Sequence, residues 1–292
     1  MIEYNGKMRN MKGAEGKIAV LYHAECSDGF GAAFSAWKKF GKKALYLPVY
    51  HQTNFPAEAE GADVFMVDFA YPPEVLKSLK EKIKSLTIID HHLSAKDSVA
   101  LADNKIYDMN HSGSVLAWKY FHPDEKVPKL LEYIEDQDIW KFELPDSREI
   151  NRAIDQFYDY DFKIWEKMLA DFEHPKKLEK YKEEGAVLVK VEDKRIEKII
   201  GDAEEVVFEG IKCLAANSPI LNSFIGAKLV KKMPPMGIIW HRKKDRIRVS
   251  LRGDGTVDLS VIAQKYGGGG HKSAAGFYVD GITFEKLIGL RK

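Results

Sequence analysis

The chain has 292 residues, of which 45% are hydrophobic and 30% are charged. That composition is typical of a globular protein, and the length suits two domains of ordinary size. Lys and Arg number 45 against 44 Asp and Glu, so the net charge of +1 excludes a protein that holds nucleic acid by bulk charge alone.

The cysteines and the N-terminus bear on the compartment. Cys26 and Cys213 are the only two cysteines, and they lie too far apart for a CxxC pair, which favours a reducing cytoplasm over a disulfide framework. No apolar run approaches the roughly 20 residues that span a bilayer. Residues 1–16 are polar and lack the apolar centre of a secretory signal. We expect them to form a disordered lead-in to a cytoplasmic protein without a membrane partner.

The first half of the chain alternates apolar runs with helical patterns. Helices are predicted over residues 30–40 and from Pro72-Pro73 to Lys84, since proline is tolerated in a first helical turn. Strands are predicted over residues 18–22, 44–49, 64–67 and 86–89. Strands separated by helices of about a dozen residues imply crossover connections and a parallel sheet.

The middle of the chain is predicted to be helical. Ser112 is a plausible N-cap for a helix that runs to Tyr120, and residues 127–135 form another helical pattern. Trp140 is interpreted as a core residue. Residues 165–200 are rich in Lys and Glu with apolar residues at helical spacing. They predict one or two long helices that bridge two domains, although a solvated surface helix has the same pattern.

The last part of the chain changes character near residue 204. Strands are predicted over residues 206–215, 236–240, 247–251 and 276–279, with a helix over 259–265. The expected fold is therefore α/β, with a parallel-sheet domain over residues 17–160, a helical linker over 161–203 and a smaller mixed α/β domain over 204–292.

Metal-binding residue types follow three of the predicted strands. Ligands of an open parallel sheet bind beyond the carboxyl ends of its strands, so these side chains should converge in one crevice. A single Asp after a strand is often only a turn residue or a helix cap, but repetition at three strand ends favours a site. Carboxylate and imidazole ligands suit Mn²⁺, Mg²⁺ or a similar ion. The residues are His23, Cys26 and Asp28 after the first strand, Asp68 after the third, and Asp90, His91 and His92 after the fourth.

A glycine-rich segment near the C-terminus predicts an anion site. The four glycines at 267–270 would let the backbone approach an anion closely, with N–H groups free to donate. His271 and Lys272 add hydrogen-bonding and positive groups, and the small residues at 273–275 could start a tightly packed helix. Arg252 could clamp a phosphate with its guanidinium, and Arg248 is a weaker candidate of the same kind. By itself, a glycine-rich segment is a weak signal, because a flexible turn has the same composition.

The motifs and their order resemble those of one family. The sequence IIDHH at 88–92 resembles the motif that gives the DHH phosphoesterase superfamily its name, and VDF at 67–69 resembles the family's second motif. HAECSDGFGAA at 23–33 is similar to its first motif and EDQDIW at 135–140 to its fourth. GGGGHKSAAGF at 267–277 closely resembles the signature of the DHH-associated C-terminal domain. Together the matches extend over nearly the whole chain.

The resemblance implies a role for each matching residue. His23 and Asp68 would bind one metal ion, and Asp28, Asp68, His91 and Asp136 a second, with Asp68 bridging. Asp90 would orient its neighbours by hydrogen bonds, and His92 would contact the substrate phosphate. Asp138 is the alternative to Asp136. The substrate would be held by Gly268, Gly269, Gly270 and His271, with Arg252 as their partner.

Cys26 departs from the family pattern, which has an aspartate two residues before the position of Asp28. Cys26 could bind a metal, which would favour a softer ion such as Zn²⁺ or Fe²⁺. Glu25 could replace the aspartate through a shifted backbone, or the first metal site could be weak or empty. Cys26 could also be a small buried packing residue.

The resemblance implies a metal-dependent phosphodiesterase of the nano-RNase or oligoribonuclease type. It would cut short oligonucleotides or dinucleotides from one end with one or two divalent ions, of which manganese is favoured and magnesium, zinc, iron or cobalt are options. One alternative is an exopolyphosphatase or another phosphoanhydride hydrolase, because the metal chemistry is shared. The other is a catalytically impaired nucleotide-binding protein, which Cys26 motivates. The oligomeric state is left open, with a homodimer as one option.

Overall fold

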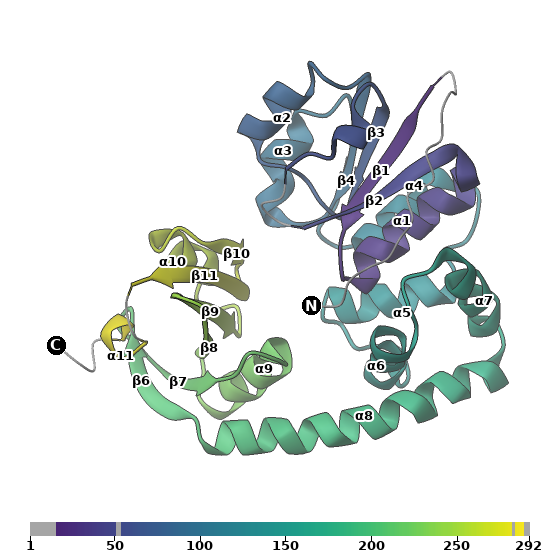
Figure 1. Cartoon of the computed structure of the whole chain (residues 1–292). Coiled ribbons are helices and arrows are strands. Elements are labelled where there is room, and N and C mark those ends of the chain that lie inside the picture. The colour runs from purple at the N-terminus through teal and green to yellow at the C-terminus, as the bar shows by residue number, and fades with distance from the viewer. Residues whose placement is uncertain (1–15, 51–53, 282–283, 289–292) are drawn as a thin grey trace.

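The computed structural model describes residues 16–50, 54–281 and 284–288 of the chain. Apart from Gly16, the lead-in expected at residues 1–16 lies outside these residues. Two α/β domains are joined along one side by a long helix (Figure 1). This arrangement confirms the fold class expected from the sequence. No helix in the described part of the chain is long and apolar enough to cross a membrane.

The N-terminal domain is built on a five-stranded sheet in the order β2-β1-β3-β4-β5, in which all neighbours are parallel. The predicted sheet lacked β5, because its residues Asn104–Tyr107 form a short, half-exposed edge strand with two apolar side chains. The strands are β1 (Ile18–His23), β2 (Ala44–Val49), β3 (Asp63–Val67), β4 (Ser85–Asp90) and β5 (Asn104–Tyr107).

Helices cover both faces of this sheet (Figure 1). The helices α1 (Ser27–Phe40) and α4 (Gly113–Phe121) pack on the face that carries Val20, Val67 and Ile89. The helices α2 (Pro73–Leu79) and α3 (Lys96–Ala100) pack on the face that carries Leu21, Met66 and Ile88. Because both faces are buried, the strands read as continuous apolar runs rather than alternating ones.

A second layer of helices packs beside α1. It consists of α5 (Lys129–Asp138), α6 (Ser147–Phe157) and α7 (Phe162–Phe172), and α6 was not predicted. The layer meets α1 through aromatic side chains: the rings of Phe30 and Trp165 lie 4.9 Å apart, and Trp165 is fully buried. The segment expected to bridge the domains is thus two helices, and the first of them belongs to the core of the N-terminal domain.

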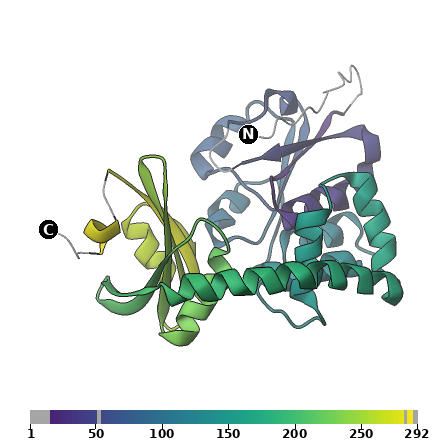
Figure 2. The same cartoon turned by 60° about the horizontal axis from the view of Figure 1, so that its bottom comes forward.

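The helix α8 (Pro175–Gly201) runs for 27 residues between the two domains (Figures 1 and 2). Its first half crosses α6 so closely that a Cβ on Gly185 would lie 1.7 Å from the carbonyl oxygen of Glu149. Arg152 on α6 pairs with Glu192 on α8 at 2.8 Å. Its last turns bury Ile196 and Ile200 against the C-terminal domain. The bridging helix is therefore fastened at both ends.

The C-terminal domain is built on a six-stranded mixed sheet in the order β10-β11-β9-β8-β7-β6. One strand predicted over 206–215 is a hairpin instead, because Glu209 and Gly210 take positive φ values of 51° and 77° and reverse the chain. The strands are β6 (Glu204–Phe208), β7 (Ile211–Asn217), β8 (Met236–Lys243), β9 (Arg246–Gly253), β10 (Gly269–His271) and β11 (Ala274–Asp280).

The two faces of this sheet are covered unequally. The helices α10 (Leu259–Lys265) and α11 (Phe284–Leu287) pack on the face that carries Val249 and Phe277. The helix α9 (Asn222–Lys232), which was not predicted, packs on the other face, where Leu229 and Ile225 cover Ile239 of β8. α9 reaches β9 at Arg252, and the rest of that face over β9 and β11 lines an open cavity.

Candidate active site

The candidate site lies at the switch point of the parallel sheet. β1 and β3 are neighbours in the order 2-1-3-4-5, so the connections from their carboxyl ends diverge and leave a crevice. His23 ends β1, Asp68 follows β3, and Asp90 ends β4 and is followed by His91 and His92. The structure thus brings together at one edge the side chains that the sequence placed after three strands.

Asp68 lies at the centre of this group. Its side chain is 2% exposed, and its backbone has a positive φ of 54°, which is uncommon outside glycine. One carboxylate oxygen is 3.7 Å from Nδ1 of His23, and the other is 3.2 Å from Nε2 of His91. Gly113, at the start of α4, leaves room for it, since a Cβ there would lie 2.5 Å from Cβ of Asp68.

Asp28 links the first turn of α1 to the start of α4. Its carboxylate accepts hydrogen bonds from the backbone N–H groups of Gly113 at 2.7 Å and Ser114 at 3.0 Å. It also lies 3.8 Å from Nε2 of His91. Burial, together with the charge of Asp68, raises the pKa of Asp28 to about 6. A cation in the crevice would relieve this repulsion between carboxylates.

The segment at 135–140 supplies three carboxylates with three different roles. Glu135 accepts a hydrogen bond from the N–H of Ser112 at 2.9 Å and so fixes the start of α4. Asp136 accepts the N–H groups of Glu143 and Leu144 and closes the turn after α5. Asp138 points into the crevice, 3.5 Å from Nε2 of His91.

These contacts favour Asp138 over Asp136 as the fourth-motif residue that faces the crevice. Asp136 is buried, and its oxygens are committed to the backbone of its own loop, so the structure does not bring it to the other metal-binding side chains. Asp138 lies with Asp28 and His91 in a group whose donor atoms are all within 4.8 Å of one another. Burial, followed by the charge of Asp28, raises the pKa of Asp138 above its usual value.

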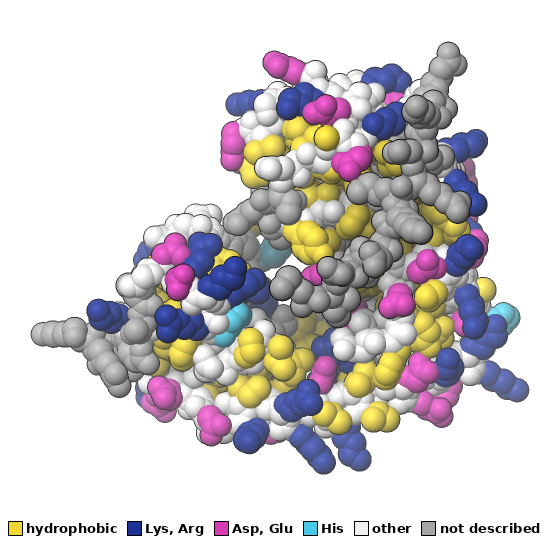
Figure 3. Space-filling view, in the orientation of Figure 1, with side chains coloured by type: hydrophobic (Ala, Val, Ile, Leu, Met, Phe, Trp, Pro, Cys, Tyr) yellow, Lys and Arg dark blue, Asp and Glu magenta, His cyan; other side chains and the backbone are white. Residues whose placement is uncertain are grey.

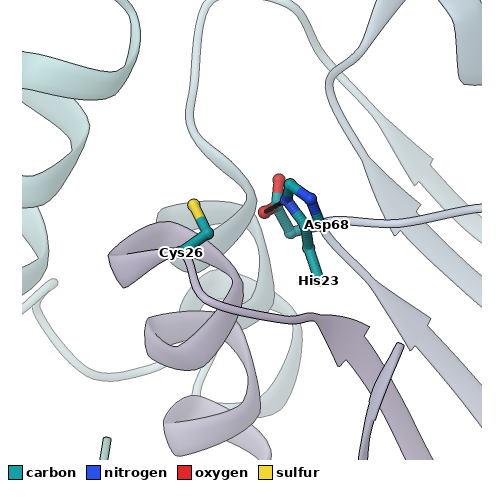
Figure 4. A group of neighbouring side chains, drawn as sticks. All are labelled: His23, Cys26 and Asp68. Atoms are coloured by element: carbon teal, nitrogen blue, oxygen red, sulfur yellow. Dashed lines mark ion pairs between the residues drawn. The ribbon is translucent and has the colours of Figure 1, made fainter. Parts of the chain in front are cut away.

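Cys26, the N-cap residue of α1, faces the crevice (Figure 4). Its Sγ, a nitrogen of His23 and an oxygen of Asp68 form a second group of donor atoms within 4.8 Å of one another. Glu25, the alternative to Cys26, instead accepts a hydrogen bond from the hydroxyl of Tyr50 at 3.1 Å. Burial, and then the charge of Asp68, raises the pKa of the Cys26 thiol well above its usual value.

Two buried atoms in the crevice lack a hydrogen bond. They are Oδ1 of Asp68 and Nε2 of His91, which lie 3.2 Å apart. Leaving such atoms unsatisfied is costly, and a divalent cation between them would satisfy both. Burial alone would lower the pKa of His91, but the charges of Asp68 and Asp28 raise it to about 9. The donor set of carboxylate, imidazole and thiol therefore fits a divalent metal ion.

Asp90 orients the two histidines that follow it. Its Oδ1 accepts the backbone N–H groups of His91 at 2.7 Å and His92 at 2.9 Å, and it lies 2.8 Å from Nδ1 of His92. Burial acts to lower the pKa of His92, but the contact with Asp90 raises it to about 10. The ring of His92 lies 6.2 Å from that of His271, which belongs to the other domain. The metal-binding crevice and the glycine-rich segment therefore face each other.

The glycine-rich segment is a hairpin strand rather than a free loop. The N–H groups of Gly267 and Gly268, which we expected to be free, donate to the carbonyls of Gln264 and Ala263 at the end of α10. Gly269 and Gly270 pair with β11, so residues 273–275 lead into a strand and not into the helix that the sequence suggested.

The glycines differ in what requires them. Gly267 and Gly270 have φ values of +72° and +141°, and a Cβ on Gly268 would lie 2.2 Å from the carbonyl oxygen of Gly276. A Cβ on Gly269 would meet nothing within 4 Å. The fold therefore accounts for three of the glycines, and Gly269 borders the open cavity of about 610 Å³ over β9 and β11.

Arg252 lines the same cavity at its inner end. Its guanidinium donates to the hydroxyl of Ser223 at 2.8 Å and to the carbonyl of Leu251 at 2.9 Å. A Cβ on Gly226 of α9 would lie 2.4 Å from Cγ of Arg252, so this glycine makes room for the arginine stem. Burial lowers the pKa of Arg252. Neither Ser223 nor Gly226 carries a sequence signal, since α9 was not predicted.

Sequence reasoning also missed the residues that hold α4 in place. Gly113 lies against Asp68, and Glu135 accepts the N–H of Ser112. In both cases the two partners are far apart in the sequence. The only available signal was the pattern Ser112-Gly113-Ser114, which was interpreted as a helix cap. Ser112 does cap α4, because its hydroxyl accepts the N–H of Val115. Trp140 was expected in the core, yet it is 44% exposed and packs against Phe224 of the other domain at 5.1 Å.

Known proteins are similar to this chain in sequence. A model of the DHHA1 domain matches residues 215–289. An uncharacterised protein, R106 of Acanthamoeba polyphaga mimivirus, is 33% identical over 92% of this chain and 70% of its own length. The oligoribonuclease NrnB of Bacillus subtilis is 23% identical over 92% of this chain and 74% of its own.

Solved structures share the fold at low identity. An exopolyphosphatase-related protein from Bacteroides fragilis superposes with a TM-score of 0.56 at 12% identity, with 94% of this chain and 90% of that one covered. The exonuclease RecJ bound to manganese superposes with a TM-score of 0.53 at 14% identity, with 94% and 87% covered. Fold and site together define a two-domain metallohydrolase of phosphate esters. The chain belongs to the DHH family of metal-dependent phosphoesterases, and its site suits a divalent metal ion.

Proposed function

We propose that this protein is a metal-dependent phosphodiesterase that removes nucleotides from one end of short oligonucleotides or dinucleotides. The observation that carries the proposal is the short distance between the two domains, with the rings of His92 and His271 6.2 Å apart. A metal-binding crevice on one side and a cavity lined by arginine and glycine on the other enclose a small site. The end of a short substrate fits where these two surfaces meet.

Two metal positions follow from the groups of donor atoms. His23, Cys26 and Asp68 would hold one ion, and Asp28, His91 and Asp138 would hold the other. Asp68 would bridge them, because its two oxygens face His23 and His91 respectively. Manganese is the first ion to test. The thiol of Cys26 makes the first position softer than an all-oxygen and imidazole site, so cobalt, iron and zinc belong in the same panel.

Divalent ions supply the Lewis acidity that makes water nucleophilic near neutral pH and that neutralises charge on a phosphate. The chain's own residues would do the remaining work. Asp90 holds His92 with its Nδ1 committed, and the raised pKa of His92 keeps the ring protonated at neutral pH. A protonated His92 can bind a phosphate oxygen through a charge-assisted hydrogen bond. His271 and Arg252 would hold the same substrate from the opposite domain.

One relative by sequence favours a nucleotide substrate. The relative from Bacillus subtilis is an oligoribonuclease, and it is similar to this chain over both domains. The structural neighbour related to exopolyphosphatases shares the fold alone. Phosphoanhydride hydrolysis therefore remains the second hypothesis to test, and a bound but uncut nucleotide the third.

The proposal is tested with end-labelled RNA of two and five nucleotides, incubated with Mn²⁺, Mg²⁺, Co²⁺, Zn²⁺ or EDTA. Asp68→Asn serves as the inactive control and Asp97→Asn, on the outer helix α3, as the matched control. We expect metal-dependent release of mononucleotides that Asp68→Asn abolishes and Asp97→Asn retains. If the protein released inorganic phosphate from polyphosphate and cleaved no RNA, the hypothesis of phosphoanhydride hydrolysis would replace the proposal.

A further inference from the structure

The cavity beside the candidate site continues along the sheet as a basic groove. On β9 the alternate residues Arg246, Arg248, Ser250 and Arg252 point to one face, and all four line the cavity. The opposite residues of β11 on that face include Gly276 beside Ser250 and Tyr278 beside Arg248. We call the surface formed by Arg246, Arg248, Ser250 and Tyr278 the β9 groove.

The groove is open because α9 stops short of it. α9 covers the β7 and β8 part of this face, where Leu229 packs against Gly237 of β8. Over β9 and β11 the small residues Gly276 and Gly269 leave a hollow instead. Figure 3 shows Lys and Arg side chains gathered on this part of the C-terminal domain, beside the hollow between the domains.

The groove begins at the candidate active site. Arg252 of β9, Ala274 of β11 and His271 of β10 lie in one row across the sheet, and His271 faces His92. From that row to the row of Arg246 is six residues, or about 20 Å at roughly 3.3 Å per strand residue. The guanidinium groups of Arg252, Arg248 and Arg246 thus follow one another away from the metal-binding crevice.

The arginines differ in how they are paired. Arg252 is held by Ser223, and Arg246 pairs with Asp280 at 2.7 Å. Arg248 lies between them and is exposed, and its guanidinium has no hydrogen bond or ion pair with any described residue. Among the residues that line the cavity, Asp280 is the one acidic side chain, and it sits in the outermost row. The groove therefore offers an unpaired cation in its middle and ends at a negative charge.

An aromatic platform accompanies the cations. The guanidinium of Arg246 stacks over the ring of Tyr278 at 4.7 Å from its centroid. Stacked arginine and tyrosine planes are the surfaces on which unpaired bases stack, whereas a chain of inorganic phosphate gains nothing from them.

We infer that the β9 groove binds the nucleotides that follow the scissile one in a linear single-stranded oligonucleotide. Arg248 contacts a backbone phosphate and the Arg246–Tyr278 stack carries a base. The groove accordingly sets a preferred substrate length of a few nucleotides, with dinucleotides too short to reach it. This inference rests on the proposed function and adds to it the part of the substrate that lies away from the metals.

The first test compares kcat/KM for RNA of two, three and five nucleotides. We expect wild type to prefer the pentanucleotide, and Arg248→Ala to lower the ratio of pentanucleotide to dinucleotide kcat/KM by roughly tenfold, the effect of one charge-assisted hydrogen bond. Arg242→Ala is the matched control, because Arg242 lies on the same hairpin opposite Ile247 and so faces away from the groove. If Arg248→Ala leaves the ratio of pentanucleotide to dinucleotide kcat/KM unchanged, the inference is overturned. Cleavage of the dinucleotide by the same variant would still uphold the proposed function.

The second test measures binding without catalysis, by fluorescence anisotropy of a labelled pentanucleotide in EDTA at several salt concentrations. The slope of log affinity against log salt should fall in magnitude by about 0.7 in Arg248→Ala, the value for one single-strand phosphate contact. Tyr278→Ala should weaken binding severalfold with the slope unchanged. Equal loss of affinity for pentanucleotide and for polyphosphate in Tyr278→Ala would overturn the assignment of a base to this stack. If wild type bound the pentanucleotide but cleaved no RNA, that result would instead count against the proposed function.

Discussion

Asp136 and Asp138 lie two residues apart, and their carboxylates make different contacts. The Asp136 carboxylate accepts the N–H groups of Glu143 at 2.9 Å and Leu144 at 3.2 Å. In Asp136→Asn, one oxygen becomes an amide that faces a backbone N–H, so a charge-assisted bond is lost and a buried donor is left unpaired. We expect the free energy of unfolding to fall by about 2–3 kcal/mol. Metal affinity should change less than about threefold, since Asp136 touches none of the other donor atoms.

Asp138→Asn should show the reverse pattern. Its attraction to His91 and its repulsion from Asp28 oppose each other, so the unfolding free energy in EDTA should change by less than about 1 kcal/mol. Metal affinity should fall more than about 100-fold, because changes to residues that only orient a ligand already cost about 10–100-fold.

The measurements are urea denaturation in EDTA and calorimetric titration with Mn²⁺ for both variants. Glu143→Gln serves as a matched control at the same turn, since the partner of Asp136 there is the backbone of Glu143 and not its side chain. If Asp136→Asn lost metal binding while its stability stayed at the wild-type value, the assignment of Asp138 to the crevice would be refuted.

Four further changes probe the rest of the site. Gly113→Ala should reduce Mn²⁺ affinity at least about tenfold, since its Cβ would lie 2.5 Å from that of Asp68, and titration calorimetry of the folded variant checks this. Despite burial, the carboxylates around His91 raise its pKa to about 9, and a metal ion needs the neutral ring. Mn²⁺ affinity should therefore rise by up to about tenfold per pH unit below pH 9 and level off above it. Calorimetry in buffers of different ionisation enthalpy checks this by measuring the proton released on binding. Cys26→Asp should abolish the thiolate-to-metal absorption band of the Co²⁺ protein, and its absence from wild type would exclude Cys26 as a ligand. Gly269→Ala should keep wild-type stability and raise KM for oligonucleotides, because its Cβ meets no protein atom and enters the cavity; an unchanged KM would mean that substrate does not approach this strand.

The sheet of the N-terminal domain was predictable because its strands are buried on both faces. Long apolar runs such as those of β3 and β4 have few other interpretations, and each ends at a polar residue that the fold then uses. β5 escaped prediction for the opposite reason, because it is half-exposed and has only two apolar side chains. α6 was missed although it buries Ile150, Ala153 and Ile154 on one face, which is the spacing of a helix.

The candidate site was predictable where its residues follow strands and unpredictable where they depend on contacts between distant segments. His23, Asp68 and His91 follow directly from the end of a strand. The choice between Asp136 and Asp138 depends on how the turn after α5 folds back, which no local pattern encodes. The β9 groove depends on where α9 ends, and that helix carried no signal in the sequence.

The attachment of α8 at both ends gives the space between the two binding surfaces a defined length. The helix is fixed to α6 through the close passage at Gly185 and to the C-terminal domain through Ile196 and Ile200. Its 27 residues extend for about 40 Å, so it acts as a strut rather than a hinge. One residue inserted between the two attachments would rotate the whole C-terminal domain by about 100° and carry His271 away from His92.

Seven inserted residues would restore the orientation to within about 20° and widen the gap by roughly 10 Å. Lengthening α8 by whole turns would therefore adapt this architecture to larger substrates, while every residue of both binding surfaces stays the same.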